Sequence, residues 1–262
     1  DPSWIDEIEV LLWSGGRLEK HEESTKGIPG STNYEHWLVT VSPQINWIVD
    51  ERWAVRTGAQ IDSEIPQNFP SLLDTKNQVT FGPMFSLEFS PKEDLKFGLS
   101  AARRARFPTL KERFADAFGT QVPNPSLGAE KAWNFSFDTT FRALDWMLLK
   151  LSVFDSEVYD LIVRELVGPN LYQLQNSSRA RFLGAEAAIG FHFEDQKVDA
   201  ELGYQYLFAR KLSNSYPASQ LEYRPQHKGR LSAAWKPSKF FGVSTDLIVT
   251  GPRPYVNPES GA

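Results

Sequence analysis

The chain has 262 residues and a mildly acidic formal net charge of -5 at pH 7, with no block of charges of one sign. A nucleic-acid groove needs clustered Lys and Arg, so this charge distribution argues against one. The sequence has no cysteine, which excludes disulfides, thiolate metal sites and cysteine nucleophiles. It also lacks a run of about 18 apolar residues, so it predicts no membrane-spanning helix.

Apolar and polar residues alternate with a period of two along most of the chain, which is typical of strands with one apolar and one polar face. Many of these segments exceed the usual strand length of about 5–6 residues, and about 9–11 residues are enough for a tilted strand to cross a bilayer. The alternation predicts about eleven strands. They are expected near residues 8–12, 37–41, 53–61, 79–89, 95–99, 133–141, 149–153, 183–193, 198–206, 229–235 and 241–250.

Short and long connections take turns along the chain. Short turns are expected near residues 49–50, 92–93, 144–145, 194–196 and 237–238, and long loops near 23–34, 63–76, 106–129, 165–171 and 212–219. In an up-and-down antiparallel sheet, this puts all long loops at one end and all short turns at the other. The pattern predicts an all-β fold, an antiparallel up-and-down transmembrane β-barrel of which this chain forms part.

Tryptophans support the same fold class. Trp47, Trp53, Trp146 and Trp235 all flank short turns, where an aromatic girdle at a membrane interface would lie. The alternative is a soluble β-sandwich with an aromatic core, which rarely combines long strands with alternating loop lengths. On the polar face, glycines within strands predict either a strongly curved sheet or the close approach of an inserted domain. These glycines are Gly58, Gly82, Gly98, Gly190 and Gly203.

The segment from Ala105 to Glu130 does not follow the alternation. Pro108, Pro123 and Pro125 lack the N–H group that a sheet requires, so the segment is expected to stay outside the sheet. A connection this long is uncommon in a compact domain and is usually functional or disordered.

Three segments in and after this region resemble one known family. Residues 106–114 (RFPTLKERF) are similar to an Arg-Ala-Pro-Thr-Leu-x-Glu-Leu-Tyr segment, and residues 124–131 (NPSLGAEK) to an Asn-Pro-x-Leu-Lys-Pro-Glu-Lys segment. Residues 153–162 with 176–186 resemble the hairpin that follows. Their order and spacing resemble the β-barrel of TonB-dependent outer-membrane receptors. The matching positions are Arg106, Pro108, Thr109, Leu110, Glu112, Asn124, Pro125, Leu127, Glu130, Gly184 and Glu186. Arg113 and Ala129 depart from the pattern, which often has leucine and proline there.

The resemblance implies a receptor of the bacterial outer membrane, not an enzyme and without a cofactor. Such a receptor imports a scarce nutrient, of the siderophore-iron, cobalamin or glycan class, through a barrel closed by a plug domain and energised by TonB. Residues 1–262 are then expected to be an internal portion of the barrel, without a plug domain or the terminal strands. The implied partners are outer-membrane lipid, lipopolysaccharide, the plug domain, TonB and a small nutrient. The alternatives are a passive porin-like or adhesive barrel and a soluble β-rich carbohydrate-binding domain.

A cluster of cations beside the central segment is the strongest candidate site. It consists of Arg103, Arg104, Arg106, Lys111 and Arg113. Guanidinium groups suit bidentate binding of carboxylates, phosphates or an anionic chelate. The same cations suit lipopolysaccharide phosphates, or local ion pairs with Glu112, Asp116 and Glu130, which is the commonest role of such groups.

Other chemistry is not predicted. The sequence has neither a Gly-x-Ser-x-Gly elbow nor a phosphate-binding loop. Its four histidines, His21, His36, His192 and His227, lack the spacing of metal ligands, so no metal site is expected.

Overall fold

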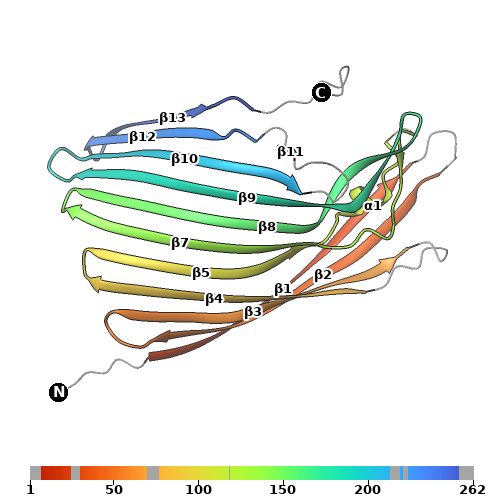
Figure 1. Ribbon diagram of the computed structural model, residues 1–262, viewed down its shortest axis with the longest axis horizontal. Helices are drawn as coiled ribbons and strands as arrows, with labels where there is room; N and C mark the ends of the chain where they lie inside the picture. Colours follow the sequence, from red (N-terminus) through yellow and green to blue (C-terminus); the bar gives the residue numbers. More distant parts are fainter. Residues whose placement is uncertain are drawn as a thin grey trace.

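The computed structural model describes residues 7–24, 30–69, 77–117, 119–212, 219–220 and 224–253. Within these ranges the chain forms one twisted sheet that curls into an open trough (Figure 1). Its elements, in chain order, are β1 (Glu7–Glu23), β2 (Thr32–Ile48), β3 (Trp53–Asn68), β4 (Gln78–Lys92), β5 (Leu95–Arg106), α1 (Leu110–Phe114), β6 (Gln121–Val122), β7 (Glu130–Leu144), β8 (Met147–Gly168), β9 (Leu171–Phe193), β10 (Val198–Leu212), β11 (Ser219–Gln220), β12 (His227–Ser238) and β13 (Phe241–Thr250).

The eleven long strands pair in chain order, as an up-and-down sheet requires. The path is β1-β2-β3-β4-β5-β7-β8-β9-β10-β12-β13, with the two-residue strands β6 and β11 attached to β9 and β10. All pairings along the path are antiparallel. In the described part of the chain, β1 and β13 each have one neighbour, so the trough has two open edges. The predicted fold class and strand count are therefore confirmed.

The expected long loop at residues 165–171 is wrong. β8 and β9 are 22 and 23 residues long and continue to pair as far as Gly168 and Leu171. Only Pro169 and Asn170 form the turn, and Asn170 takes the left-handed φ of 58° that a tight turn needs. Gly168 and Pro169 indicated a loop, but Gly168 is the last residue of β8 and only Pro169 lies in the two-residue turn. The expected loops near residues 23–34, 63–76 and 212–219 lie partly outside the described residues.

The sheet has two chemically different faces. On the outer face, apolar side chains lie opposite one another, for example Leu99 with Phe137 and Val153 with Ala185. Phe137, at 48% exposure, has almost half of its surface uncovered, as a lipid-facing side chain would. The inner face carries polar residues such as Asp138 in the same strands. No helix in the described ranges is long and apolar enough to span a membrane.

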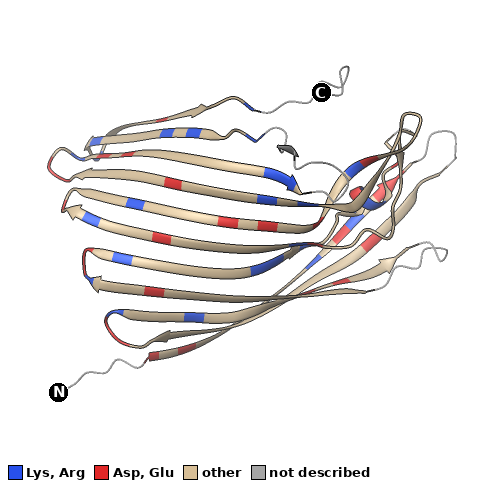
Figure 2. Cartoon of the chain, in the orientation of Figure 1, with Lys and Arg blue, Asp and Glu red and all other residues tan. Residues whose placement is uncertain are grey.

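The packed core lies at the end of the trough that carries α1. Pro108, Leu110, Phe114 and Leu127 are all buried there. The Phe114 ring stacks on Tyr34 with ring centroids 3.9 Å apart, so the connection between β5 and β7 packs against β2. Charged residues lie around α1, along the strands and at the short turns of the opposite end (Figure 2).

Close approach of the neighbouring strand accounts for two of the inner-face glycines. A Cβ at Gly58 would lie 2.4 Å from the Pro43 carbonyl oxygen, and one at Gly82 would lie 2.4 Å from the Arg103 carbonyl oxygen. The backbones there are too close for any side chain. At Gly203 nothing lies within 4 Å, so a close backbone does not explain that position.

Candidate functional site

Residues 107–129, here called the folded loop, turn back onto the inner face at the end of the trough. The loop contains the one-turn helix α1, which begins after Thr109. The Thr109 hydroxyl accepts a hydrogen bond from the Glu112 N–H, and the Glu112 carboxylate accepts one from the Thr109 N–H at 2.8 Å. This is a capping box, and it satisfies two backbone donors at the start of the helix. The Thr-x-x-Glu spacing predicts such a cap, but the helix was not expected from the sequence.

Arg106 joins this helix to the strands on either side of the loop. Its Nε donates to Glu130 Oε2 at 2.7 Å, and its Nη1 donates to Glu112 Oε2 at 2.9 Å. Glu130 Oε1 accepts from the Ile162 N–H at 2.8 Å, so the ion pair continues to β8. The hydrogen bond to Glu130 raises the pKa of Arg106, although burial opposes this. Burial alone would raise the pKa of Glu112, but the hydrogen bonds from Arg106 and Thr109 outweigh it and lower that pKa.

The second half of the loop is held by two amide side chains from distant strands. Asn176 in β9 accepts from the Gly128 N–H at 2.7 Å and donates to the Gly128 carbonyl at 3.0 Å. Gln78 in β4 donates to the Leu127 carbonyl at 3.0 Å and accepts from the Ala129 N–H at 3.2 Å. Each amide side chain therefore bonds to one backbone N–H and one backbone carbonyl of the loop. The loop is thus fixed between β4 and β9, which are not neighbours in the sheet.

Part of the loop joins the sheet, against expectation. Gln121 and Val122 form β6, which pairs in parallel with Tyr172 and Gln173 of β9. The pairing stops at Pro123, where the backbone loses its donor. The prolines therefore limit the added strand to two residues without keeping the whole segment out of the sheet.

A buried chain of charges fixes the helix to the first three strands. Arg113, only 1% exposed, donates from Nη2 to Glu64 Oε2 at 2.6 Å and to the Leu127 carbonyl at 3.0 Å. Glu64 Oε1 lies 2.5 Å from His36 Nδ1, and His36 Nε2 lies 3.0 Å from Glu19 Oε2. One network of hydrogen bonds thus runs from Arg113 through Glu64 and His36 to Glu19, across α1, β3, β2 and β1. Sequence reasoning missed this network because its members are distant along the chain and belong to separate strands.

The sequence was also compared with models of known protein families. Residues 23–262 match the model described as TonB dependent receptor-like, beta-barrel.

The chain belongs to the TonB-dependent receptor β-barrel family.

This is an outer-membrane family of receptors and transporters. A comparison with curated protein sequences found no match.

Solved TonB-dependent receptors share the fold at low sequence identity. The FrpB iron transporter from Neisseria meningitidis has a TM-score of 0.64 and 15% identity, over 87% of this chain and 38% of that chain. The siderophore receptor PirA from Acinetobacter baumannii has a TM-score of 0.72 and 12% identity, over 94% and 40%. A mutant of the ferric enterobactin receptor from Pseudomonas aeruginosa, in complex with enterobactin, has a TM-score of 0.73 and 15% identity, over 95% and 40%. The chain therefore spans about 40% of the length of such receptors.

The five candidate cations of this TonB-dependent receptor barrel are divided between two faces. Arg103 lies on the outer face and donates to the Phe81 carbonyl. Arg104 lies on the inner face, where it donates to the Gln60 side chain. Arg106 and Arg113 are held in the ion pairs described above, and Lys111 is exposed on α1. The structure therefore does not bring the five together into one site.

The last two motif residues lie away from the folded loop. Gly184 makes room for an aromatic ring, since a Cβ there would lie 2.4 Å from Phe154 Cζ. Glu186 accepts from the Gln205 amide at 2.6 Å on the inner face.

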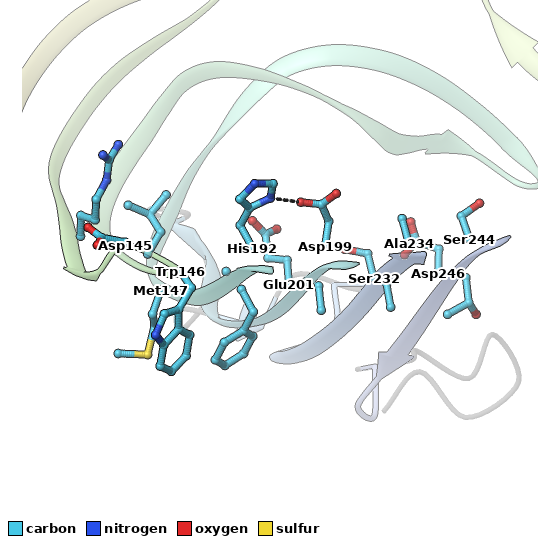
Figure 3. Close-up of a pocket in the computed structure, with 17 residues that line it drawn as sticks. Asp145, Trp146, Met147, His192, Asp199, Glu201, Ser232, Ala234, Ser244 and Asp246 are labelled. Atoms are coloured by element: carbon cyan, nitrogen blue, oxygen red, sulfur yellow. Dashed lines mark hydrogen bonds and ion pairs between the residues drawn. The ribbon is translucent and has the colours of Figure 1, made fainter. Parts of the chain in front are cut away.

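A groove of about 850 Å³ opens on the inner face near the short turns. Figure 3 shows His192 and Asp199 on the side of the sheet that the ribbon encloses, with the His192 Nδ1 atom 2.6 Å from Asp199 Oδ1. Arg142, Asp145, Glu201 and Asp246 also line it, and Lys150 and Arg230 form ion pairs with Glu201 and Asp246. In the described ranges no group of three or more His, Asp or Glu side chains is arranged to hold a metal ion.

Proposed function

We propose that this chain forms part of the wall of a receptor that imports a scarce nutrient across the outer membrane. The observation that carries the proposal is the folded loop, which the network of Arg106, Arg113 and Asn176 fixes across the inner face at the mouth of the trough. A loop that is fixed in this way suits a receptor, because ligand affinity is higher when the ligand-contacting groups are held in place before the ligand arrives.

An iron chelate is the ligand class that we favour over cobalamin and glycans. Solved structures that share the fold include an iron transporter, a copper transporter and a siderophore receptor. In this chain, Arg104 and Lys111 present positive charge at the inner face and on the exposed side of α1. Such groups suit the negative charge of many chelates.

The inner face is proposed to hold a plug domain in the complete receptor. Polar side chains such as Asp138 and Glu186 lie on it, and polar groups also line its groove, where they could contact a folded partner. TonB would supply the energy by rearranging that plug, and outer-membrane lipid would cover the apolar outer face.

Ligand binding by the complete receptor tests the proposal. Iron chelates, corrinoids and glycans should be compared, and uptake should be measured with and without TonB. We expect one iron chelate to bind, and Arg104→Ala with Lys111→Ala to weaken its binding by about tenfold or more, as expected for lost charge-assisted hydrogen bonds.

Lys92→Ala is the matched control, because Lys92 is an exposed cation at a short turn at the opposite end. Unchanged binding in the double variant would remove Arg104 and Lys111 from the ligand site. TonB-independent entry of every ligand would overturn the proposal of active import.

A further inference from the structure

The ends of β8 and β9 project beyond the strands on either side of them. β7 pairs with β8 only as far as Tyr159, and β10 pairs with β9 only as far as Arg179. In the described ranges, residues 161–178 therefore have no neighbour from β7 or β10, and they are here called the projecting hairpin. Figure 1 shows this part of β8 and β9 bending past the end of β10.

Two irregularities interrupt the ladder at the base of the projecting hairpin. β8 has one extra residue between its pairs at Val158 and Leu161, and Asp160 there takes a left-handed φ of 55°. β9 has one extra residue close by, Ser177. Extra residues of this kind disrupt the ladder locally and bend the strand. The base is therefore the point at which the projecting hairpin can tilt relative to the sheet.

The folded loop is attached to the projecting hairpin in three ways. β6 pairs with it in parallel, Asn124 donates to the Leu174 carbonyl at 2.8 Å, and Asn176 makes its two hydrogen bonds to Gly128. Asn176 Nδ2 also donates to the Asp160 carbonyl at 2.7 Å, so the same amide spans the irregular part of the ladder. A tilt of the projecting hairpin would therefore pull on the folded loop.

The same loop is attached to the strands on the far side of β5, β7 and β8. Gln78 of β4 bonds to Leu127 and Ala129, on either side of Gly128. Residues 127–129 thus form a bridge between β4 and β9 across the three strands that separate them in the sheet. The buried network adds an attachment of α1 to β1, β2 and β3.

We propose that the folded loop transmits movement between the projecting hairpin and strands β1–β4. The hairpin would tilt at its irregular base, and the loop holds it in one position only while the loop is attached on both sides. A displacement of the hairpin therefore loosens the loop on the inner face, and release of the loop frees the hairpin. This inference goes beyond the proposed function and needs no ligand, so it stands or fails independently of nutrient import.

Pulsed electron spin resonance on the complete receptor tests this, with one spin label at the hairpin tip and one on β3. The chain has no cysteine, so Val167→Cys and Gln67→Cys, both at exposed positions, place the labels once any cysteine elsewhere in the receptor is replaced. We expect one narrow distance distribution in the labelled receptor. Gln78→Ala, which removes hydrogen bonds to the loop and none to the hairpin, should add a second, shifted distance.

Gln44→Ala is the matched control, because Gln44 is an inner-face glutamine of β2 that bonds to Ser42. It should leave the distribution unchanged. An unchanged distribution in Gln78→Ala would overturn the proposal, since the hairpin would then be held without help from β4.

The reverse direction is tested at α1. Asn176→Ala should speed hydrogen exchange at the Arg113 and Ala115 amides, although the hydrogen bonds of Asn176 go to Gly128 and Asp160. Asn124→Ala removes a different attachment of the hairpin and should have the same effect, so it replaces Asn176→Ala if that variant does not fold. Unchanged exchange at α1 would show that the attachment is local and would exclude transmission through the loop.

Discussion

At the scale of single residues, Arg113 determines how the folded loop is attached. Leucine is common at the matching place of the family pattern, and an apolar residue would need no partner. Arg113 has one: Glu64, which is itself completely buried and also contacts His36. Burying either charge without the other is costly, so the arginine and the glutamate act as a pair.

Replacement of Arg113 by leucine should therefore destabilise the protein, unless Glu64 is replaced by glutamine as well. Arg113→Leu leaves the Glu64 charge buried beside His36 and should lower the free energy of unfolding by about 3–5 kcal/mol. Arg113→Leu with Glu64→Gln should recover most of that loss, because no unpaired charge remains. Denaturant unfolding in detergent measures both. If the double variant is no more stable than the single one, the ion pair of Arg113 with Glu64 is not what attaches the folded loop.

Gly184 offers a second test at this scale. Gly184→Ala would put a methyl group against the Phe154 ring and 2.9 Å from the Tyr206 carbonyl oxygen, and should destabilise the protein by about 1–3 kcal/mol. Gly203→Ala is the control, because nothing lies within 4 Å of its added Cβ. The thermal midpoints of the two variants in detergent should differ clearly, and equal midpoints would contradict the close contact.

At the scale of elements, α1 is too short to be stable without its cap and its neighbours. A single helical turn gains little from its own hydrogen bonds. The helix is stabilised by its capping box, by the Arg106 ion pairs and by the burial of Leu110 and Phe114.

Acid should therefore loosen the helix. The folded state lowers the pKa of Glu112, so its stabilising effect is present above the ordinary carboxyl pKa of about 4.3 and is lost as the pH falls through the lowered value. Hydrogen exchange at the Arg113 and Ala115 amides, measured from pH 7 downward and corrected for intrinsic rates, should show this loss. Glu112→Gln should exchange faster at neutral pH and show a smaller pH dependence. Parallel profiles for the two proteins would exclude Glu112 as the cause.

The same elements show what the sequence could predict. Period-two alternation was sufficient to predict the eleven long strands, because successive side chains in a strand point to opposite faces and these faces differ in polarity. The ion pairs of Arg106 could be proposed because Glu112 and Glu130 lie in or next to the same loop. The pair of Arg113 with Glu64 could not, since strand alternation says nothing of which inner-face residue a distant loop will reach. The two-residue strand β6 was missed for the same reason, because its partner β9 lies about 50 residues further along.

At the scale of the whole molecule, the apolar outer face indicates that this side of the sheet contacts lipid. Large apolar side chains such as Leu151 and Leu202 are more than half exposed, over a continuous surface. A soluble monomer rarely exposes an apolar patch of this extent. The soluble carbohydrate-binding alternative conflicts with this surface.

Tryptophan fluorescence should separate the two faces. Brominated lipid should quench the emission of Trp133 and Trp235, which lie on the outer face, and spare Trp13, which the register places on the inner face. Trp133→Phe should therefore reduce the quenchable fraction in reconstituted receptor, whereas Trp13→Phe should raise it. Quenching that does not change between the two variants would contradict the lipid-facing assignment.

The attachments of the folded loop also constrain the order in which the protein can fold. Arg113 is 49 residues after its partner Glu64, and Gly128 is 48 residues before Asn176, so the loop needs strands from both sides of it in the sequence. Such long-range contacts form only after the cost of closing the intervening chain has been met. β1–β5 can pair before β9 exists, but the loop cannot settle until β9 is in place. Amides of residues 107–129 should therefore gain protection later than those of the β3–β4 hairpin when the receptor is refolded and sampled by pulsed hydrogen exchange.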